Sequence, residues 1–572
     1  MLKSRQNALR PSKIRSVDDH RPLRVVVIGA GISGILACIR LAQRIPNLDL
    51  CIYEKNADIG GTWHENVYPG CACDIPANTY QASFEPNKEW SSFYAPAAEI
   101  HQYWKRVVEK YGCMEHIKLQ QQVTSAAWNE RSSKWQLGKP KVHNVDRDIK
   151  YEDRCDILVQ ATGSLNNWKW PKIPGLHDFK GKVMHSATWD TQYDYTNQRI
   201  AVIGNGSSGI QIVPGILPKV AHIDHYMRNR TWIAPGFARG ELDRRGIDAE
   251  NYSFTAEEIE TFKNDSEAYQ KFRKDTEFLL QSDHPFTITG TPKQVGSIPF
   301  FIDNMTRRLA KKPELLDQIL PDFPVACRRL TPGPGYLEAL TDPKVDLIKT
   351  EIVQVNETGI LTADGVHRQV DMIACATGFD TTYVPRFPIT GRGGLSLSDR
   401  WRESPETYIS VATDGFPNHF MIFGPNSALG AGNLILLFEK QVEYLTECIL
   451  KIQRDNIRTM TARPHAVQQF SRYCREYFKG TVYNSKCRSW YRGGKEQGDI
   501  MALWPGSSLH AMRVFSNPRW EDFDYDYLNN NPMGWFGDGW TANERNNTIN
   551  VDYLDDDQID FPTPSPRMVE GK

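Results

Sequence analysis

The sequence predicts an α/β fold that contains two similar strand–turn–helix units. Two apolar runs each end in a GxGxxG turn, one at Gly29 and one at Gly204, and apolar residues at helical spacing follow each turn. A charged segment with helical periodicity, residues 240–324, lies beyond the second turn. These observations together predict two Rossmann-like dinucleotide-binding domains, with a helical insertion in the second.

The composition of the 572 residues excludes several classes of protein. A net charge of -1 gives no basis for nucleic-acid binding or for a polybasic membrane patch. No apolar run approaches the ~18 residues of a membrane span, so we expect no integral membrane contact. Residues 1–22 are basic but lack the apolar core of a secretory signal peptide, so we expect a disordered leader, with a transit peptide as the alternative. The prediction is a soluble, cytoplasmic protein.

The eleven cysteines are scattered along the chain and form no CxxC pair. This pattern favours reduced thiols in a reducing compartment. Cys71 and Cys73 form a CxC, but no third or fourth ligand is spaced near them, so we interpret them as loop packing and expect no metal site.

The first unit begins with a strand predicted at residues 23–28 and continues into the turn with Gly29, Gly31 and Gly34. These glycines allow the backbone to approach a pyrophosphate, and the helix N-terminus supplies N–H donors and a positive partial charge. A second apolar run, residues 48–53, ends at Glu54, where a carboxylate is expected to bind ribose hydroxyls. The sequence therefore predicts a dinucleotide site in this unit.

The residues that follow have the spacing [AG]-G-x-W-x4-[FY]-P-[GM]-x3-D, which is met at every fixed position from Gly60 to Asp74. A second pattern, F-x-G-x3-H-x3-W-[PD], is met by Phe179, Gly181, His185, Trp189 and Asp190. On these two patterns the chain, over roughly residues 23–515, resembles the Baeyer-Villiger monooxygenases, a family of class B flavoprotein monooxygenases. The stretch Trp504–His510 is similar to that of fungal members often found in secondary metabolism.

The second unit contains a strand at residues 199–203 and a turn with Gly204, Gly206, Ser207 and Gly209. A second turn of this kind indicates a second dinucleotide. Arg228 and Arg230 stand where the first unit has Glu54, and a guanidinium there favours a 2'-phosphate, so we expect NADPH rather than NADH. Asn229 departs from the family's Q-R-T pattern, which leaves the strictness of that preference open.

The resemblance implies cofactors FAD and NADPH, and a reaction in which O2 and a ketone give an ester or lactone. It assigns Arg329 the role of a permanent cation that stabilises the anionic oxidant, with Asp74 orienting its guanidinium. Arg328, where Lys is usual, is expected at the 2'-phosphate. The resemblance implies that His185 and Trp189 couple the motion of the two domains. The alternative for His185 is a structural role as a hydrogen-bonded histidine. The expected cofactor-binding residues are Gly29, Gly31, Gly34, Glu54, Gly61, Thr62, Trp63, Asp74, Gly204, Gly206, Ser207, Gly209, Arg228, Arg328, Ser427 and Trp490.

The domain boundaries predicted from these motifs are as follows: a leader at 1–22, the first part of the FAD-binding domain at 23–178, the NADPH-binding domain at 179–375, the second part of the FAD-binding domain at 376–540, and a flexible acidic tail at 541–572. Within the insertion at about 240–324, a capping box from Thr255 to Glu258 predicts one helix, and residues 305–320 suggest another.

Two other functions remain open from the sequence. An N- or S-oxygenating flavin monooxygenase shares both glycine turns but not the Asp74 pattern, and a flavin-binding scaffold without turnover is the non-enzyme alternative. A disulfide reductase is excluded because it needs a CxxC beside the flavin. We predict a bulky natural-product ketone as the substrate. The sequence does not identify the individual ketone, the regiochemistry of the reaction or the oligomeric state.

Overall fold

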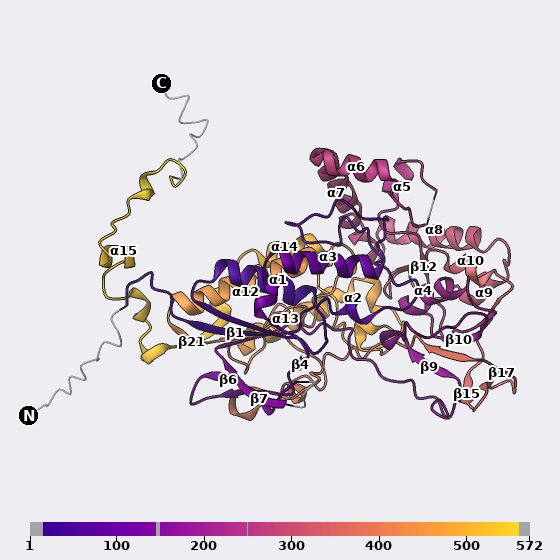
Figure 1. The fold of residues 1–572 in the computed structure, drawn as a ribbon, viewed down its shortest axis with the longest axis horizontal. Coiled ribbons are helices and arrows are strands. Elements are labelled where there is room, and N and C mark those ends of the chain that lie inside the picture. The colour runs from indigo at the N-terminus through magenta and orange to yellow at the C-terminus, as the bar shows by residue number, and fades with distance from the viewer. Residues whose placement is uncertain (1–14, 145–148, 249, 560–572) are drawn as a thin grey trace, which may run out of the picture.

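The computed structural model describes residues 15–144, 149–248 and 250–559, and Figure 1 shows their fold. The first large sheet has the order β20-β8-β1-β2-β3, and all its pairings are parallel. Its strands are β1 (Leu23–Ile28), β2 (Leu48–Tyr53), β3 (Ile117–Lys118), β8 (Ile157–Gln160) and β20 (His419–Met421). The helices α1 (Ile32–Arg44), α3 (Ala97–Lys110) and α12 (Leu434–Arg454) contribute to the same core cluster. Strands covered on both faces are uniformly apolar, which is why β1 could be recognised in the sequence.

The second large sheet is also wholly parallel and has the order β14-β11-β10-β18-β9. Its strands are β9 (Lys182–His185), β10 (Arg199–Ile203), β11 (His222–Tyr226), β14 (Val345–Ile348) and β18 (Met372–Cys375). The helices α4 (Ser207–Ile216) and α10 (Tyr336–Leu340) pack against it. Two separate parallel sheets, each with a glycine turn after a central strand, match the predicted fold class.

The smaller elements connect these sheets. They are α2 (Thr62–Glu65), the parallel pair β12 (Ile233–Ala234) and β13 (Thr331–Pro332), the antiparallel strands β15 (Ile352–Val355), β16 (Gly359–Thr362) and β17 (His367–Gln369), and the helix α11 (Leu397–Arg400).

A third sheet contains strands that the sequence did not predict. The polar residues 138–144 and 149–153 belong to the antiparallel pair β6 (Lys134–Asn144) and β7 (Ile149–Cys155). The strands β4 (Gln121–Gln122), β5 (Ala126–Asn129) and β19 (Ile389–Thr390) complete the sheet. The pairing rests on backbone hydrogen bonds, while Trp135 and Leu137, both buried, anchor β6 to the core. Polar composition therefore did not prevent strand formation.

The insertion between the second glycine turn and Arg329 is helical, and Figure 1 shows its helices at one end of the molecule. They are α5 (Gly240–Arg244), α6 (Ala256–Asn264), α7 (Ser266–Gln281), α8 (Pro292–Arg308) and α9 (Leu315–Ile319). The capping box is confirmed: Thr255 caps α6 and accepts from the Glu258 N–H, and the Glu258 side chain accepts from the Thr255 N–H. The expected helix over residues 305–320 was wrong, because α8 begins at Pro292, continues through Pro299 and ends at Arg308.

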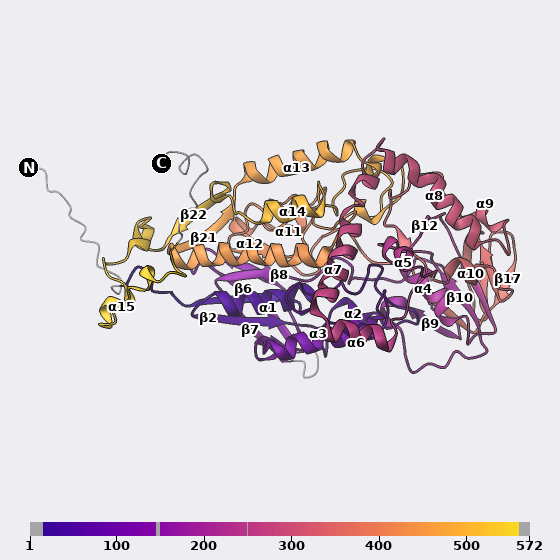
Figure 2. The ribbon, with the colours of Figure 1, turned by 90° about the horizontal axis from the view of Figure 1, so that it is seen from above.

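The C-terminal part of the chain contains α13 (Pro464–Lys479), α14 (Ser508–Phe515) and the strand pair β21 (Ile457–Ala462) and β22 (Phe523–Tyr527), which share the core of the first sheet (Figure 2). The short helix α15 (Ala542–Arg545) lies apart from this body. Residues 15–22, expected within a disordered leader, are held here: Val17 donates its N–H to the Trp540 carbonyl at 3.0 Å, and Arg21 donates to the Ile457 carbonyl at 2.7 Å. The expectation is corrected for these residues, because hydrogen bonds tie them to the body. Residues 1–14 and 560–572 lie outside the described part.

No helix among the described residues is long and apolar enough to cross a membrane.

Candidate active site

The first glycine turn is shaped by close backbone contacts. A Cβ on Gly34 would lie 1.9 Å from the Gly29 carbonyl oxygen, so only glycine allows α1 to start this close to β1. Glu54, which is 4% exposed, accepts hydrogen bonds from the N–H groups of Ala30 at 2.8 Å and Asn56 at 2.9 Å. Burial raises the pKa of Glu54 above its ordinary value despite these two donors. One function of Glu54 is therefore to hold the turn itself.

Both glycine turns lead into a helix that no side chain caps in the described structure. The N-caps of α1 and α4 are Gly31 and Gly206, so the first N–H groups of each helix receive no hydrogen bond from a capping side chain. A Cβ on Gly206 would meet no atom of the described chain within 4 Å. Ser207 is exposed, and its hydroxyl lies 3.0 Å from the hydroxyl of Thr331. Free N–H donors at an open helix N-terminus fit the phosphates of a dinucleotide.

The segment from Gly61 to Asp74 connects the two units. Gly61 lies against Gly31 and caps α2, Thr62 is exposed, and Trp63 is buried with its indole N–H donated to the Tyr80 hydroxyl at 3.2 Å.

Farther along, the segment crosses onto α4 of the second unit. The Tyr68 hydroxyl donates to Gln211 Oε1 at 2.9 Å, and Gln211 Nε2 donates to the Ala72 carbonyl at 3.0 Å. A Cβ on Gly70 would lie 2.4 Å from the Gln211 carbonyl oxygen, and one on Gly215 would lie 2.6 Å from the Pro69 carbonyl oxygen. Asp74 thus follows the point where the backbones of the two units touch.

Asp74 forms an ion pair with Arg329. Arg329 Nη2 lies 2.7 Å from Asp74 Oδ2 and 2.8 Å from Oδ1, and Nε lies 3.1 Å from Oδ2. The two side chains are 27% and 29% exposed. Burial lowers the pKa of Arg329, but the charge and hydrogen bonds of Asp74 outweigh it, so the pKa is raised above its ordinary value. The guanidinium is therefore both charged and fixed in direction.

Aromatic side chains surround this guanidinium. The ring of Phe237 lies beneath Arg329, with 5.5 Å from the guanidinium carbon to the ring centroid. The Phe237 carbonyl accepts a 2.7 Å hydrogen bond from the hydroxyl of Tyr94. The hydroxyls of Tyr491 and Tyr483 also interact electrostatically with Arg329. Burial raises the pKa of Tyr491 to about 12, although Arg329 opposes this shift. These tyrosines stay protonated and available as donors at neutral pH.

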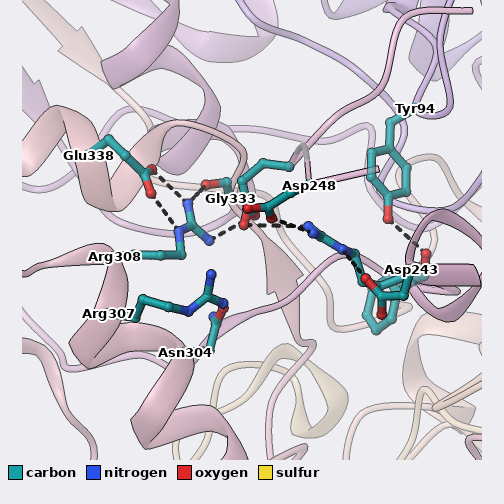
Figure 3. Close-up of polar contacts among 11 residues, drawn as sticks. Tyr94, Asp243, Asp248, Asn304, Arg307, Arg308, Gly333 and Glu338 are labelled. Carbon is teal, nitrogen blue, oxygen red and sulfur yellow. Dashed lines mark hydrogen bonds and ion pairs between the residues drawn. The ribbon is translucent and has the colours of Figure 1, made fainter. Parts of the chain in front are cut away.

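A buried arginine supports the segment that follows Arg329 (Figure 3). Arg308, at the end of α8, donates to both carboxylate oxygens of Glu338 at 2.7 and 2.8 Å and to the Gly333 carbonyl at 2.7 Å. Its Nη1 lies 3.1 Å from Oε2 of Glu250, and the other carboxylate oxygen of Glu250, Oε1, lies 3.8 Å from Nη1 of Arg239. The Arg308 side chain is 4% exposed. This network fixes the helical insertion to the segment that carries Arg329.

Two further arginines act electrostatically on Arg328, which directly precedes Arg329. Arg328 lies with its guanidinium carbon 4.4 Å from the ring centroid of Phe323. Burial and the neighbouring charge of Arg488 lower the pKa of Arg328 below its ordinary value, Asp322 opposes this shift, and Arg228 adds to it. Arg228 and Arg328, both predicted from the sequence for a phosphate site, thus interact with each other, and Arg488 joins them. The sequence analysis missed Arg488, although its position directly before the Ser489-Trp490 segment was a usable signal.

The residues of the linker pattern lie at the edge of the second sheet rather than in a free connection. Gly181 and Phe179 precede β9, whose last residue is His185, and β9 pairs with β18. His185 is fully buried, its ring stacks on Trp168 with 4.6 Å between centroids, and its Nδ1 accepts from the Ala187 N–H at 3.1 Å. Burial lowers the pKa of His185 to about 4, so the ring is neutral at pH 7.

The other two linker residues also have structural contacts. Trp189 is buried in the core of the second unit, and Asp190 accepts from Lys182 Nζ at 2.6 Å. The contacts favour a structural role for this segment, and a role in coupling the two domains stays a prediction.

Ser427 and Trp490 occupy different surroundings. Ser427 is fully buried and donates its hydroxyl to the Gly424 carbonyl at 2.5 Å, so its side chain points into its own turn. Trp490 is half-buried, and its ring contacts that of Tyr491 at an interplanar angle of 59°, with 4.6 Å between ring centroids. Trp490 therefore lies next to a neighbour of Arg329, whereas Ser427 offers a ligand only its backbone.

One cysteine prediction was wrong. Cys327 and Cys487 form a disulfide, and the other nine cysteines, all within the described residues, are free. A separation of 160 residues gives no signal in a spacing pattern, which is why the sequence did not reveal the pair. Cys73 is buried in the first core and Cys71 packs against it, as expected for loop packing.

Comparison with known proteins adds to this geometry. A family model described as flavin-binding monooxygenase-like matches residues 22–238. An FAD-binding monooxygenase, tazF, of Aspergillus terreus is 40% identical over 530 residues, which cover 92% of this chain and 93% of that protein. A Baeyer-Villiger monooxygenase of Streptomyces coelicolor is 32% identical and covers 86% of this chain and 91% of its own. A solved structure of an oxidized steroid monooxygenase bound to NADP has a TM-score of 0.75 at 26% identity, and the match covers 88% of this chain and 99% of that chain.

Proposed function

The chain belongs to the flavin-dependent monooxygenases, and from this premise we propose that it is an FAD- and NADPH-dependent Baeyer-Villiger monooxygenase. The proposed reaction inserts one oxygen atom of O2 next to a ketone carbonyl and gives an ester or a lactone. The ion pair between Arg329 and Asp74 carries the proposal, because it places a permanent, oriented cation where the backbones of the two dinucleotide units meet.

The first unit is proposed to hold FAD. This is supported by the N-terminus of α1, which begins after Gly31 and has no side-chain cap, and by the exposed Thr62, which follows Gly61 in contact with Gly31. Bound FAD and NADPH supply the electrons and the activation of O2. The protein supplies N–H donors for the pyrophosphate, a buried turn held by Glu54, and a fixed cation.

The second unit is proposed to hold NADPH. The open N-terminus of α4 supports binding of the pyrophosphate, and Arg228, Arg328 and Arg488 support binding of a 2'-phosphate. A bound anion would reduce the repulsion among these like charges, which Asp322 offsets in part, so this group of arginines supports binding of a phosphorylated dinucleotide. Trp490 is proposed to lie near the nicotinamide and the substrate.

Arg329 is proposed as the catalytic residue. Negative charge develops on oxygen during Baeyer-Villiger chemistry, and a guanidinium remains protonated throughout the useful pH range. Asp74 holds that guanidinium through two oxygens, so no reorganisation is needed when the charge develops. Asp74 is thus a positioning residue, and Tyr491 is a neighbouring hydroxyl that stays protonated.

We infer that the ketone is a bulky natural product. The resemblance of Trp504–His510 to fungal secondary-metabolite enzymes supports this class of substrate, as does the structural likeness to a steroid monooxygenase.

The proposal is tested with purified protein, NADPH, 18O2 and a panel of cyclic, steroidal and polyketide ketones. A product heavier than its ketone by one 18O atom is the expected result. Oxygenation of thioethers or amines, with no ketone converted, would instead assign the protein to the N- or S-oxygenating monooxygenases. Absence of NADPH-dependent O2 consumption with every compound would identify a flavin-binding scaffold.

A further inference from the structure

The disulfide between Cys327 and Cys487 joins two segments that both carry candidate site residues. Cys327 is followed directly by Arg328 and Arg329, and Cys487 is followed directly by Arg488. The two Cα atoms lie 6.5 Å apart although 160 positions of chain separate them. Both cysteines are almost fully buried, at 1% and 3% exposure.

Neither segment has regular structure to fix its position. Residues 320–330, between α9 and β13, are all described and form no helix or strand, and Ala326 within them has a φ of +69°. Cys487 lies between two single-turn 3-10 helices, Val482–Asn484 and Trp490–Arg492. Such segments lack a ladder of backbone hydrogen bonds, so side-chain and covalent links determine where they lie.

The two segments carry like charges that interact. The neighbouring charge of Arg488 lowers the pKa of Arg328, an effect that Asp322 opposes and to which Arg228 adds. Like charges repel each other, so these arginines by themselves do not hold the two segments together. The covalent bond between Cys327 and Cys487, which directly precede Arg328 and Arg488, links the two segments without a ligand.

The same bond restrains Arg329, which pairs with Asp74 of the first unit. Cys487 lies four residues before Tyr491, a neighbour of Arg329. Ala326, which precedes Cys327, packs in one apolar cluster with Tyr483 and Tyr491, which lie on either side of Cys487 in the chain. The segment that carries Arg329 is therefore tied to the C-terminal part of the chain on one side and to Asp74 on the other.

We propose that the Cys327–Cys487 disulfide is a positioning element of this monooxygenase, which holds Arg328 beside Arg488 for the 2'-phosphate and keeps Arg329 against Asp74. The inference rests on the proposed function. The alternative is a bridge that only stabilises the fold. The two possibilities can be separated because they predict changes in different measured quantities.

The first experiment maps the cysteines of the denatured, unreduced holoenzyme by alkylation and peptide mass spectrometry. Nine alkylated cysteines and one peptide pair linked through Cys327 and Cys487 are expected. Eleven alkylated cysteines would overturn the proposal.

The second experiment compares the double variant Cys327→Ala/Cys487→Ala with the control Cys474→Ala. Cys474 is buried in the same cluster as a free thiol. We expect the double variant to bind FAD. Its KM for NADPH should rise about fivefold, with little change in KM for NADH. The ester formed per NADPH oxidised should fall about threefold, and the remaining NADPH should yield hydrogen peroxide. Neither KM nor the ester formed per NADPH oxidised depends on the amount of folded enzyme, so a change in the folded fraction leaves both constant. Unchanged ratios with a lower Tm would show a purely stabilising bridge and refute the proposal.

Reversible reduction covers the case in which the double variant does not fold. Wild-type holoenzyme is treated with dithiothreitol, whose two thiols supply the electrons and protons that convert the cystine to two thiols, and is then reoxidised with oxidised glutathione. The NADPH preference and the coupling should fall and then recover, and no change on verified reduction would contradict the proposal. If wild-type enzyme gives no product from any ketone, the proposed function fails, while the preference for NADPH over NADH still tests the role of the bridge.

Discussion

Arg329 and Asp74 lie 255 positions apart in the sequence and form an ion pair in which two nitrogens of one side chain meet both oxygens of the other. Asp74 ends the loop that crosses between the two dinucleotide units, and Arg329 ends the helical insertion. The pair therefore forms only when both units and the insertion are in their final places. The predictions below test this arrangement and the sites around it.

Removal of the cation should separate reduction from oxygenation. Arg329→Ala is expected to bind FAD and to be reduced by NADPH, yet to form ester at a rate at least about 10^2-fold lower, because no charge faces the developing negative oxygen. Product formation by mass spectrometry and flavin reduction by stopped-flow absorbance measure the two steps. Arg329→Lys serves as the control for charge without two-point geometry. Ordinary ester formation by Arg329→Ala would refute the assignment.

Removal of the positioning carboxylate should have a similar but weaker effect. Asp74→Ala keeps the guanidinium but frees its direction, so oxygenation is expected to fall about 10^2-fold while flavin reduction persists. Asp74→Asn, which retains one acceptor oxygen, should recover part of the rate. If Asp74→Ala oxygenates the ketone at the wild-type rate, the carboxylate has no orienting role.

The second glycine turn offers a test that separates ligand binding from folding. Gly206 has an ordinary φ of -78° and open space around its Cβ position, so Gly206→Ala should fold with an unchanged Tm. Its methyl group would occupy the space where the pyrophosphate approaches, and KM for NADPH is expected to rise about tenfold or more. Gly209→Ala is the contrasting variant, because its Cβ would lie 1.9 Å from the Gly204 carbonyl oxygen and should impair folding. Wild-type NADPH kinetics for a folded Gly206→Ala would place the ligand elsewhere.

Arg488 is predicted to contribute to cofactor preference. Arg488→Ala should raise KM for NADPH about tenfold, the effect of one lost charge-assisted hydrogen bond, and leave KM for NADH nearly constant. Lys486→Ala removes an exposed cation two positions away and is the matched control. Steady-state kinetics with both nucleotides measure the effect, and equal changes for NADPH and NADH would exclude a phosphate contact.

Buried histidines should make stability depend on pH. Burial lowers the pKa of His225 and His419 to about 4 from an ordinary value of 6.5. Between these values the unfolded chain binds protons that the folded chain does not, so each histidine reduces the free energy of unfolding as pH falls from 6.5 toward 4 and contributes nothing to the slope above 6.5.

His419→Phe tests this effect, since His419 packs against Trp135 and Phe416. Relative to wild type, the variant should gain up to about 1.4 kcal/mol per pH unit as pH falls from 6.5 to 5. Urea unfolding at pH 7, 6 and 5 gives the difference. His465→Asn, at an exposed position, is the control and should give a curve parallel to wild type. A parallel curve for His419→Phe would show that His419 does not titrate as stated.

Local sequence patterns were sufficient for the parts of the site that depend on backbone geometry. The turn at Gly29 requires a glycine at Gly34 because a Cβ there would strike a carbonyl oxygen, and this requirement is written directly into the spacing. The apolar runs before both turns form central parallel strands, whose burial on both faces makes them uniformly apolar. Asp74 and Arg329 were named from motifs, and the structure brings them into contact.

Features that depend on distant partners were not predicted. The link between Cys327 and Cys487 and the convergence of Arg488 with Arg328 arise from segments far apart in the chain, and neither has a periodic signal. The strand pair β6–β7 was missed because its hydrogen bonds do not depend on side-chain type. The helix α8 was missed because Pro299, which is usually a helix breaker, lies inside it.

The contact between Gly70 and α4 restricts which substitutions are tolerated where the two units meet. At Gly70 and at Gly215 main chain lies directly against main chain, and a single methyl group on either would act as a wedge. A methyl group here would push the two units apart four residues before Asp74 and would weaken the ion pair between Asp74 and Arg329. The missing side chains of Gly70 and Gly215 therefore set how closely the two units approach each other.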